Sequence, residues 1–255
     1  MPAVITDTLR RQIARDFFEQ FQNNTANYYV AIGKSEPWDS SENVPTPVNN
    51  PETIADFRDV MQSIKRVKST SLVVPRNNWS SGTIYSQYDD RAQGYPAQPY
   101  YVKNDNSQVY VCLEAGRNRL GVAVPSVVEP TGSNNDSFRL SDGYVWKFLY
   151  TISAQKQEQF QSSNFMPVQK QLTVDSNSTG IELKQKEVQD SAKSGQVLSV
   201  IITDPGTGFV QPPTITFTGN GNGAKAIADI DSATGTLSRI RIADSGQHLA
   251  HGLGY

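Results

Sequence analysis

The sequence predicts a mainly β, β-sandwich-like protein that is α+β overall, with two amphipathic helices near its N-terminus. Apolar residues recur at helical spacing in two stretches before residue 70, and short alternating runs separated by Gly, Pro, Asn, Asp and Ser follow Leu72. A Gly-rich stretch from about residue 191 predicts a β-repeat region. We therefore expect two domains, a β domain with N-terminal helices at 1–190 and the Gly-rich region at 191–255.

The first helix is expected to start at Thr6 or Asp7, because either can act as its N-cap. Its apolar face consists of residues at four-residue spacing: Leu9, Ile13, Phe17 and Phe21. Such a face needs a covering surface. Asparagines end the helical pattern, and the residues at 28–32 then predict a short buried strand.

The second helix has a stronger start signal. Asn50 is placed as N-cap, Pro51 occupies the first helical position, and Glu52 lies in the first turn, where the helix dipole favours a carboxylate. The buried face is expected to comprise Ile54, Phe57, Met61 and Ile64. The basic residues Lys65, Arg66 and Lys68 indicate its C-terminal end.

The clearest strand is predicted at 144–152, and its inner face is aromatic or apolar: Tyr144, Trp146, Phe148, Tyr150 and Ile152. A second strand is predicted at 108–114 because its residues alternate between two sides. Val109, Val111 and Leu113 share one side, and Tyr110 and Cys112 share the other. Prolines interrupt the stretch at 85–101, which predicts a long loop.

Two segments forty positions apart are similar and predict an internal repeat of strand, Gly turn and strand. The first carries Gly195, Val197, Val200, Ile202, Asp204 and Gly206, and the second carries Gly235, Leu237, Ile240, Ile242, Asp244 and Gly246. After the first turn, a strand is expected at 214–218. The second unit stops at Tyr255 before its closing strand, which predicts either a shortened form or a longer native polypeptide.

The charge balance argues against nucleic acid as a partner. Lys and Arg number 23 against 25 Asp and Glu, so the formal charge of −2 provides no field that would steer a polyanion. No run approaches the roughly 20 apolar residues that cross a bilayer, and the opening residues lack the apolar core of a secretory signal. We expect no membrane contact and folding in a cytoplasm. The single cysteine, Cys112, fits that compartment because it can form no internal disulfide.

Few residues are suited to catalysis or metal binding. The only histidines, His248 and His251, have no thiolate partner for a zinc site, and any catalytic triad would have to use them. Gly33 and Lys34 resemble the end of a phosphate-binding loop, but Tyr28 occupies the position of its first glycine. Carboxylates of the polar loops, which a glycosidase could use, are expected to form turns. We predict no catalytic residue, no cofactor and no metal ligand.

Several aromatic residues lie in or beside the long loop: Trp79, Tyr85, Tyr88, Tyr95, Tyr100 and Tyr101. Tyrosine and tryptophan dominate interface hot spots because they bury a large rigid face and still offer a hydrogen bond. The same rings could stack on sugars, which makes a carbohydrate-binding or receptor-binding module the alternative function. For any one of them, packing into the core is equally expected.

Four stretches, taken in order, carry a resemblance to a known family. They are Ile32-Gly33-Lys34-Ser35-Glu36-Pro37-Trp38; Val74-Pro75-Arg76 with Trp79; Val109-Tyr110 with Cys112-Leu113; and Asp142-Gly143-Tyr144-Val145-Trp146. Together they span about residues 1–170. This part resembles the baseplate wedge protein 8 family of T-even-type contractile-tailed phages. The Gly-rich repeat resembles instead the β-repeats of structural proteins from phages that infect cyanobacteria.

The resemblance implies a structural, non-enzymatic subunit of the virion, located in the tail baseplate and assembled in the host cytoplasm. It implies protein–protein contacts with other baseplate wedge proteins and allows a homodimer. On this basis we expect a set of interface or fold-defining residues: Glu36, Pro37, Trp38, Pro75, Arg76, Trp79, Tyr144 and Trp146. Proline at position 37 would stiffen the chain after the first strand, since it fixes its own backbone and restrains Glu36.

Overall fold

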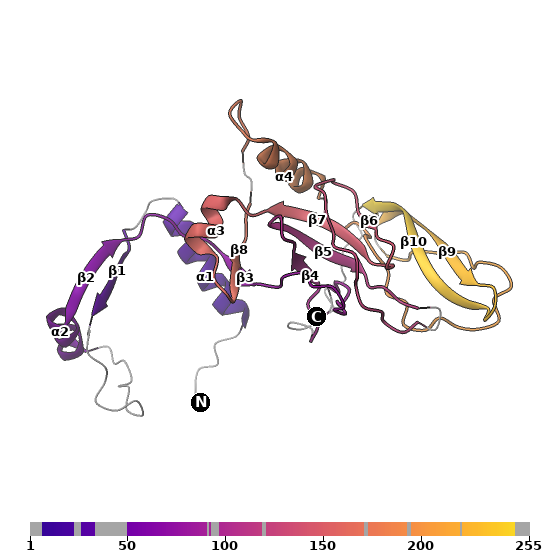
Figure 1. The fold of residues 1–255 in the computed structure, drawn as a ribbon, viewed down its shortest axis with the longest axis horizontal. Coiled ribbons are helices and arrows are strands. Elements are labelled where there is room, and N and C mark those ends of the chain that lie inside the picture. The colour runs from indigo at the N-terminus through magenta and orange to yellow at the C-terminus, as the bar shows by residue number, and fades with distance from the viewer. Residues whose placement is uncertain are drawn as a thin grey trace. The chain divides into compact units, whose positions relative to one another are not determined.

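A computed structural model describes residues 7–22, 27–33, 50–90, 92, 97–118, 121–170, 173–192, 195–219 and 221–247 of the chain (Figure 1). The chain divides into two compact units, Met1–Leu72 and Val73–Tyr255. The boundary expected near residue 190 falls inside the second unit. Whether 191–255 forms a domain of its own stays a prediction.

The described residues of the first unit form two helices and one antiparallel strand pair. Helix α1 (Asp7–Gln22) covers the segment expected from its spacing, and helix α2 (Pro51–Asp59) begins as predicted, with the Asn50 side chain accepting a hydrogen bond from the Thr53 amide at 2.7 Å. Strand β1 (Tyr29–Gly33) pairs with β2 (Met61–Arg66), and a bulge lies between Ile32 and Gly33. The start signal at Asn50 and Pro51 therefore placed the second helix, and apolar spacing placed the first. The cap expected for the first helix at Thr6 or Asp7 stays a prediction, since Thr6 lies outside the described residues.

Two expectations for this unit are wrong. The second helix ends at Asp59 instead of continuing to Ile64, because Met61–Arg66 pairs with β1 as strand β2. The strand near 28–32 exists, but it is exposed instead of buried, since the sheet to which it belongs has two strands. The predicted buried face of the second helix is also wrong, because Met61 and Ile64 belong to β2 and Ile54 and Phe57 are exposed.

The second unit is built around a four-stranded antiparallel sheet in the order β4-β5-β7-β6. Its strands are β4 (Tyr101–Lys103), β5 (Gln108–Glu114), β6 (Phe138–Arg139) and β7 (Val145–Thr151). Strand β5 has the bounds predicted from the sequence, and β7 lies within the predicted strand. The expected inner face is confirmed, because each of its members is buried: Tyr144, Trp146, Phe148, Tyr150 and Ile152.

Aromatic rings form the centre of the main core. The Tyr144 and Trp146 rings stack with centroids 5.7 Å apart, and Tyr85 meets Trp146 edge to face at 5.5 Å. Tyr110 meets Phe148 in the same way at 5.8 Å. Such edge-to-face pairs add to the hydrophobic stabilisation that each ring contributes through burial.

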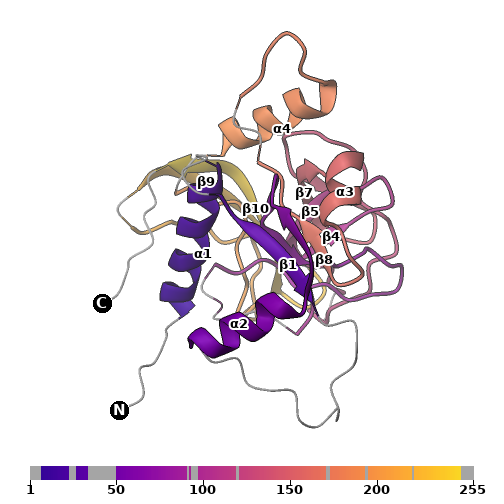
Figure 2. The ribbon, with the colours of Figure 1, turned by 90° about the vertical axis from the view of Figure 1, so that its left-hand side faces the viewer.

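Two further helices were not anticipated. Helix α3 (Ala154–Phe160) follows the cap residue Ser153 and lies against β8 (Phe165–Pro167), which pairs with β3 (Val73–Pro75). Helix α4 (Gly180–Ser191) packs beside β7, as two views show (Figure 1, Figure 2).

The C-terminal part contains one long hairpin, β9 (Asn222–Asp231) with β10 (Thr236–Gln247). The expected strand at 214–218 is reduced to a single bridge between Thr214 and Ile227. Equivalent positions of the proposed repeat share one local geometry. The Gly206 amide donates a hydrogen bond to the Asp204 carboxylate at 2.8 Å, and the Gly246 amide donates one to the Asp244 carboxylate at 3.0 Å. The repeat itself stays a prediction.

The four helices and the small antiparallel sheets among the described residues make the protein α+β, in agreement with the coarse fold class. The β-sandwich arrangement within that class stays a prediction.

Candidate interaction surfaces

The first unit exposes apolar side chains that a folded protein would normally cover. Among its described residues, none is buried. We name one row of α1 the α1 stripe; it consists of Leu9, Ile13 and Phe17, which are 48%, 56% and 46% exposed. A helix of this kind gains most of its stability from covering its apolar face. The α1 stripe therefore has the properties of a contact surface.

The paired strands β1 and β2, which we call the ribbon, expose a second apolar set. It consists of Tyr29, Val30, Ile32 and Ile64, each more than half exposed. A two-stranded ribbon is marginally stable in water without a further strand or a packed helix. The rings of Phe17 and Phe21 on α1 contact the ring of Tyr28, just before β1, with centroids 4.6 and 5.9 Å apart.

The second unit, in contrast, has its own core, and two of the predicted interface or fold-defining residues belong to it. Tyr144 and Trp146 are completely buried. The Tyr144 hydroxyl donates to the Val124 carbonyl at 2.7 Å and accepts from the Tyr85 amide at 3.2 Å. Burial raises the pKa of Tyr144. Both residues thus lie where they contribute to the fold.

Trp79 links two other stretches through a short chain of hydrogen bonds. Its indole nitrogen donates to the Ser126 hydroxyl at 3.1 Å, and Ser126 donates to the Asp142 carboxylate at 3.0 Å. The same carboxylate accepts the amides of Val127 and Val128 at 2.9 and 3.1 Å. Asp142 therefore holds the turn before β7 against the loop at 126–128, which agrees with the expectation that loop carboxylates form turns.

Pro75 and Arg76 lie at the end of β3. The Pro75 carbonyl accepts from the Tyr101 hydroxyl at 2.8 Å, and the Arg76 guanidinium donates to the Ser162 carbonyl at 3.1 Å and to Asn78 at 3.0 Å. The three remaining predicted residues, Glu36, Pro37 and Trp38, lie outside the described residues. The predicted interface role of this set stays a prediction.

The aromatic residues around the long loop have mixed environments. Tyr85 and Tyr101 are buried, Trp79 and Tyr100 are half-buried, and Tyr88 is 43% exposed. Tyr95 lies outside the described residues. Core packing thus accounts for part of this group, which leaves fewer rings for stacking on a sugar.

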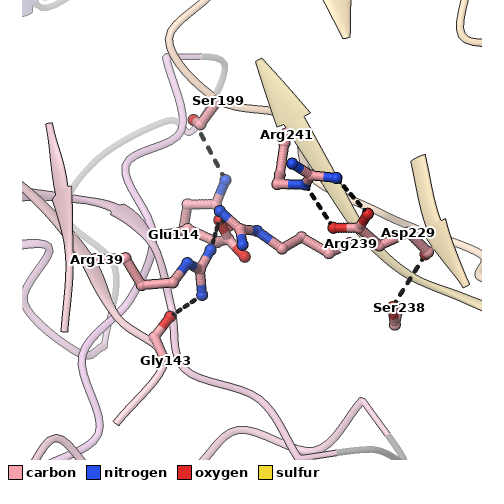
Figure 3. Close-up of polar contacts among 9 residues, drawn as sticks. Glu114, Arg139, Gly143, Ser199, Asp229, Ser238, Arg239 and Arg241 are labelled. Atoms are coloured by element: carbon pink, nitrogen blue, oxygen red, sulfur yellow. Dashed lines mark hydrogen bonds and ion pairs between the residues drawn. The ribbon is translucent and has the colours of Figure 1, made fainter. Parts of the chain in front are cut away.

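A network of charges joins the C-terminal hairpin to the four-stranded sheet (Figure 3). Glu114, at the end of β5, pairs with Arg139 of β6 and also with Arg239 of β10, whose Nε lies 3.5 Å from the carboxylate. Farther along the hairpin, Arg241 donates two hydrogen bonds of 2.7 Å to Asp229. These bonds from Arg241 hold the pKa of Asp229 below its ordinary value.

The described residues offer little for catalysis or metal binding. A pocket of about 280 Å³ lies between the sheet and the first turn of α4, and its lining carries no carboxylate, imidazole or thiol. No three His, Cys, Asp or Glu side chains gather as metal ligands in the described part of the chain. Cys112 is buried, and burial raises the pKa of its thiol to about 12, so the reactive thiolate is scarce at neutral pH. His248 and His251 lie outside the described residues.

None of the described helices is long and apolar enough to cross a membrane.

Reasoning from the sequence missed two features of these surfaces. The exposure of the ribbon could not be read from its residues, because a buried and an exposed strand of this composition look alike. Helix α4, by contrast, had a visible signal: Thr179 and Glu182 form a capping box, the S/T-x-x-E pattern that marks helix starts.

A part of the chain is similar in sequence to a known protein. It is 23% identical over 185 residues to the baseplate wedge protein gp8 of Enterobacteria phage T4, an alignment that covers 59% of this chain and 55% of that protein. The chain thus spans about half the length of the relative it matches. No family model matches the sequence. The similarity agrees with the resemblance noted from the motifs and indicates a distant relationship to a phage baseplate protein.

Proposed function

We propose that the protein is a non-enzymatic structural subunit of a phage tail baseplate wedge, located in the virion and assembled in the host cytoplasm. It holds neighbouring baseplate proteins together during assembly and during the rearrangement that host contact triggers. The distant similarity to the T4 wedge protein supports the class of function.

One observation supports this proposal most directly: the contrast between the two units. Both units expose some apolar side chains, but the second also encloses a core of stacked rings around Trp146, whereas no described residue of the first is buried and its apolar side chains are exposed on α1, α2 and both strands of the ribbon. Burial of apolar surface stabilises by about 25 cal/mol per Å², so the exposed faces of the first unit can contribute binding energy to a neighbour. The second unit is then the rigid body and the first unit the connector.

Such a connector would work through several modest contacts. When contacts are linked in one assembly, each raises the effective concentration of the next, so the whole holds more tightly than its parts. Individual contacts can still exchange when the geometry of the assembly changes. This suits a baseplate, which must stay intact before host contact and rearrange afterwards.

The test is co-purification of the full chain with sibling wedge proteins of the same phage. Size-exclusion chromatography should give a complex with the unaltered chain, and Ile13→Asp, which places a charge in the α1 stripe, should weaken the association by about tenfold or more. The matched control is Arg15→Gln on the opposite side of α1, because Arg15 forms only an exposed ion pair with Glu19 among the described contacts. Equal binding by Ile13→Asp and the unaltered chain would contradict the role of the α1 stripe.

A further inference from the structure

The guanidinium of Arg76 is held in place by neutral acceptors. Its Nε donates to the Asn78 side chain at 3.0 Å, and its Nη1 donates to the Ser162 carbonyl at 3.1 Å. The backbone is fixed as well, since the Arg76 amide donates to the Asn164 carbonyl at 2.8 Å. The Nη2 group has no hydrogen-bond partner among the described residues. Arg76 is therefore charged and oriented, and it still has N–H groups to donate.

A second cation, Lys103, lies at the end of β4 beside the segment that follows Arg76. The Lys103 amide donates to the Asn77 carbonyl at 2.7 Å, and the Lys103 carbonyl accepts from the Trp79 amide at 2.8 Å. Lys103 is 8% exposed, and its ammonium donates to the Asn104 carbonyl at 3.1 Å. Neither cation forms an ion pair with a carboxylate in the described part of the chain.

This arrangement is unfavourable for the free chain. Burial lowers the pKa of Lys103, because it disfavours the charged ammonium, and the nearby charge of Arg76 lowers this pKa further. Asp105 and Glu129 act in the opposite direction, each more weakly than Arg76. Buried charges in proteins are normally paired. A carboxylate that bound next to the two cations would therefore offset the cost of holding them together.

Exposed apolar side chains lie next to these cations, on the strand pair β3–β8 (Figure 1). Phe165 comes opposite Pro75, the residue before Arg76, and Val73 lies two positions earlier on the same strand. Phe165 and Val73 are 47% and 44% exposed. A free anion such as phosphate would leave them in water, whereas a polypeptide segment can cover them. The surroundings of the two cations thus favour a protein as the source of the carboxylate.

We propose that Arg76 and Lys103 form a binding site for an acidic side chain of a neighbouring protein, on a segment that also carries apolar residues. The carboxylate accepts hydrogen bonds from Nη1 and Nη2 of Arg76, a pairing in which the two planar groups match. Lys103 contributes a second positive charge close by. The apolar residues of the segment cover Phe165 and Val73. This inference rests on the proposed function, because it names the chemistry of one contact between the subunit and its neighbours.

The test is a titration of the full chain, isotope-labelled for nuclear magnetic resonance, with a short blocked peptide that carries Asp and Glu beside Leu and Phe. The Nε–H signal of Arg76 should shift to saturation. A matched peptide with Asn and Gln in place of the acidic residues should leave it unchanged. The bound acidic peptide should also raise the pKa of Lys103, because a nearby carboxylate stabilises the ammonium. Inorganic phosphate is titrated in parallel and should bind more weakly than the acidic peptide.

Two substitutions locate the binding. Arg76→Gln should weaken the affinity for the acidic peptide by about tenfold or more, because the charge-assisted hydrogen bonds are lost. Lys103→Met should weaken it by about threefold and leave the midpoint of urea unfolding unchanged or higher, because an apolar side chain replaces an unpaired buried charge. The matched control is Lys225→Gln, which removes a charge from an exposed side chain of β9 and should bind the peptide normally.

Several results would overturn the proposal. They are an acidic peptide that gives no saturable shift, an equal response to the neutral peptide, tighter binding of phosphate than of the acidic peptide, and a clear loss of stability in Lys103→Met. The last result would show that the ammonium supports the fold. The titration contains no wedge protein, so failure of this site can be told apart from failure of the proposed function.

Discussion

Individual buried side chains contribute strongly to the stability of the second unit, and Trp146 is the clearest example. It is completely buried, stacked on Tyr144 and met edge to face by Tyr85. Its position on the inner face could be predicted from the alternation of large rings with smaller or polar residues. What the alternation did not show is that Tyr85, far away in the sequence, completes the same cluster.

We expect Trp146→Ala to destabilise the protein by about 3–5 kcal/mol, because it removes a buried ring and leaves a cavity that the packed neighbours cannot fill. Urea unfolding of the full chain, followed by far-UV circular dichroism, measures the loss. Trp146→Phe keeps a ring and should cost clearly less. A change below about 1 kcal/mol for the alanine variant would show that this residue is not central to the core.

At the scale of elements, local signals predicted where structure begins better than where it ends. Asn50 and Pro51 placed the start of α2 correctly, because capping depends on neighbouring residues only. The end was misplaced, since Met61 and Ile64 continue a helical spacing yet are held in β2 by pairing with β1. Pairing between distant segments overrides local propensity, and one sequence does not reveal it.

Helix α4 offers a direct test of a local signal. The Thr179 side chain accepts from the Glu182 amide at 3.3 Å, and Glu182 accepts from the Thr179 amide at 2.7 Å. We expect Thr179→Ala to lower the free energy of unfolding by about 1 kcal/mol through loss of this capping box. The exposed Thr207, which caps no described helix, serves as the matched control, and Thr207→Ala should change little in the same urea titration. An equal effect of the two substitutions would argue against the capping box.

At the scale of the whole molecule, the sequence predicted the α+β class and the distant relationship to a baseplate protein. It did not predict that the buried core lies in the second unit and that no described residue of the first unit is buried. The apolar spacing of α1 could be recognised in the sequence, and it implied that another surface packs against the apolar face of the helix. Whether a helix face is covered by its own chain or by a neighbour depends on tertiary structure, and the exposure of Ile13 and Phe17 became evident only there. The exposure of the ribbon also became evident only from the tertiary structure, because its residues would suit a buried strand equally well.

The central claim is that the first unit is completed by neighbouring subunits, and hydrogen–deuterium exchange tests it most directly. The full chain is measured alone and within a reconstituted wedge. In the free chain the amides of 7–22 should exchange rapidly while those of 145–151 stay protected, because only the latter belong to an enclosed core. Assembly should slow exchange in 7–22 by about tenfold or more and leave 145–151 unchanged. Strong protection of 7–22 in the free chain, or no slowing in the wedge, would contradict the claim.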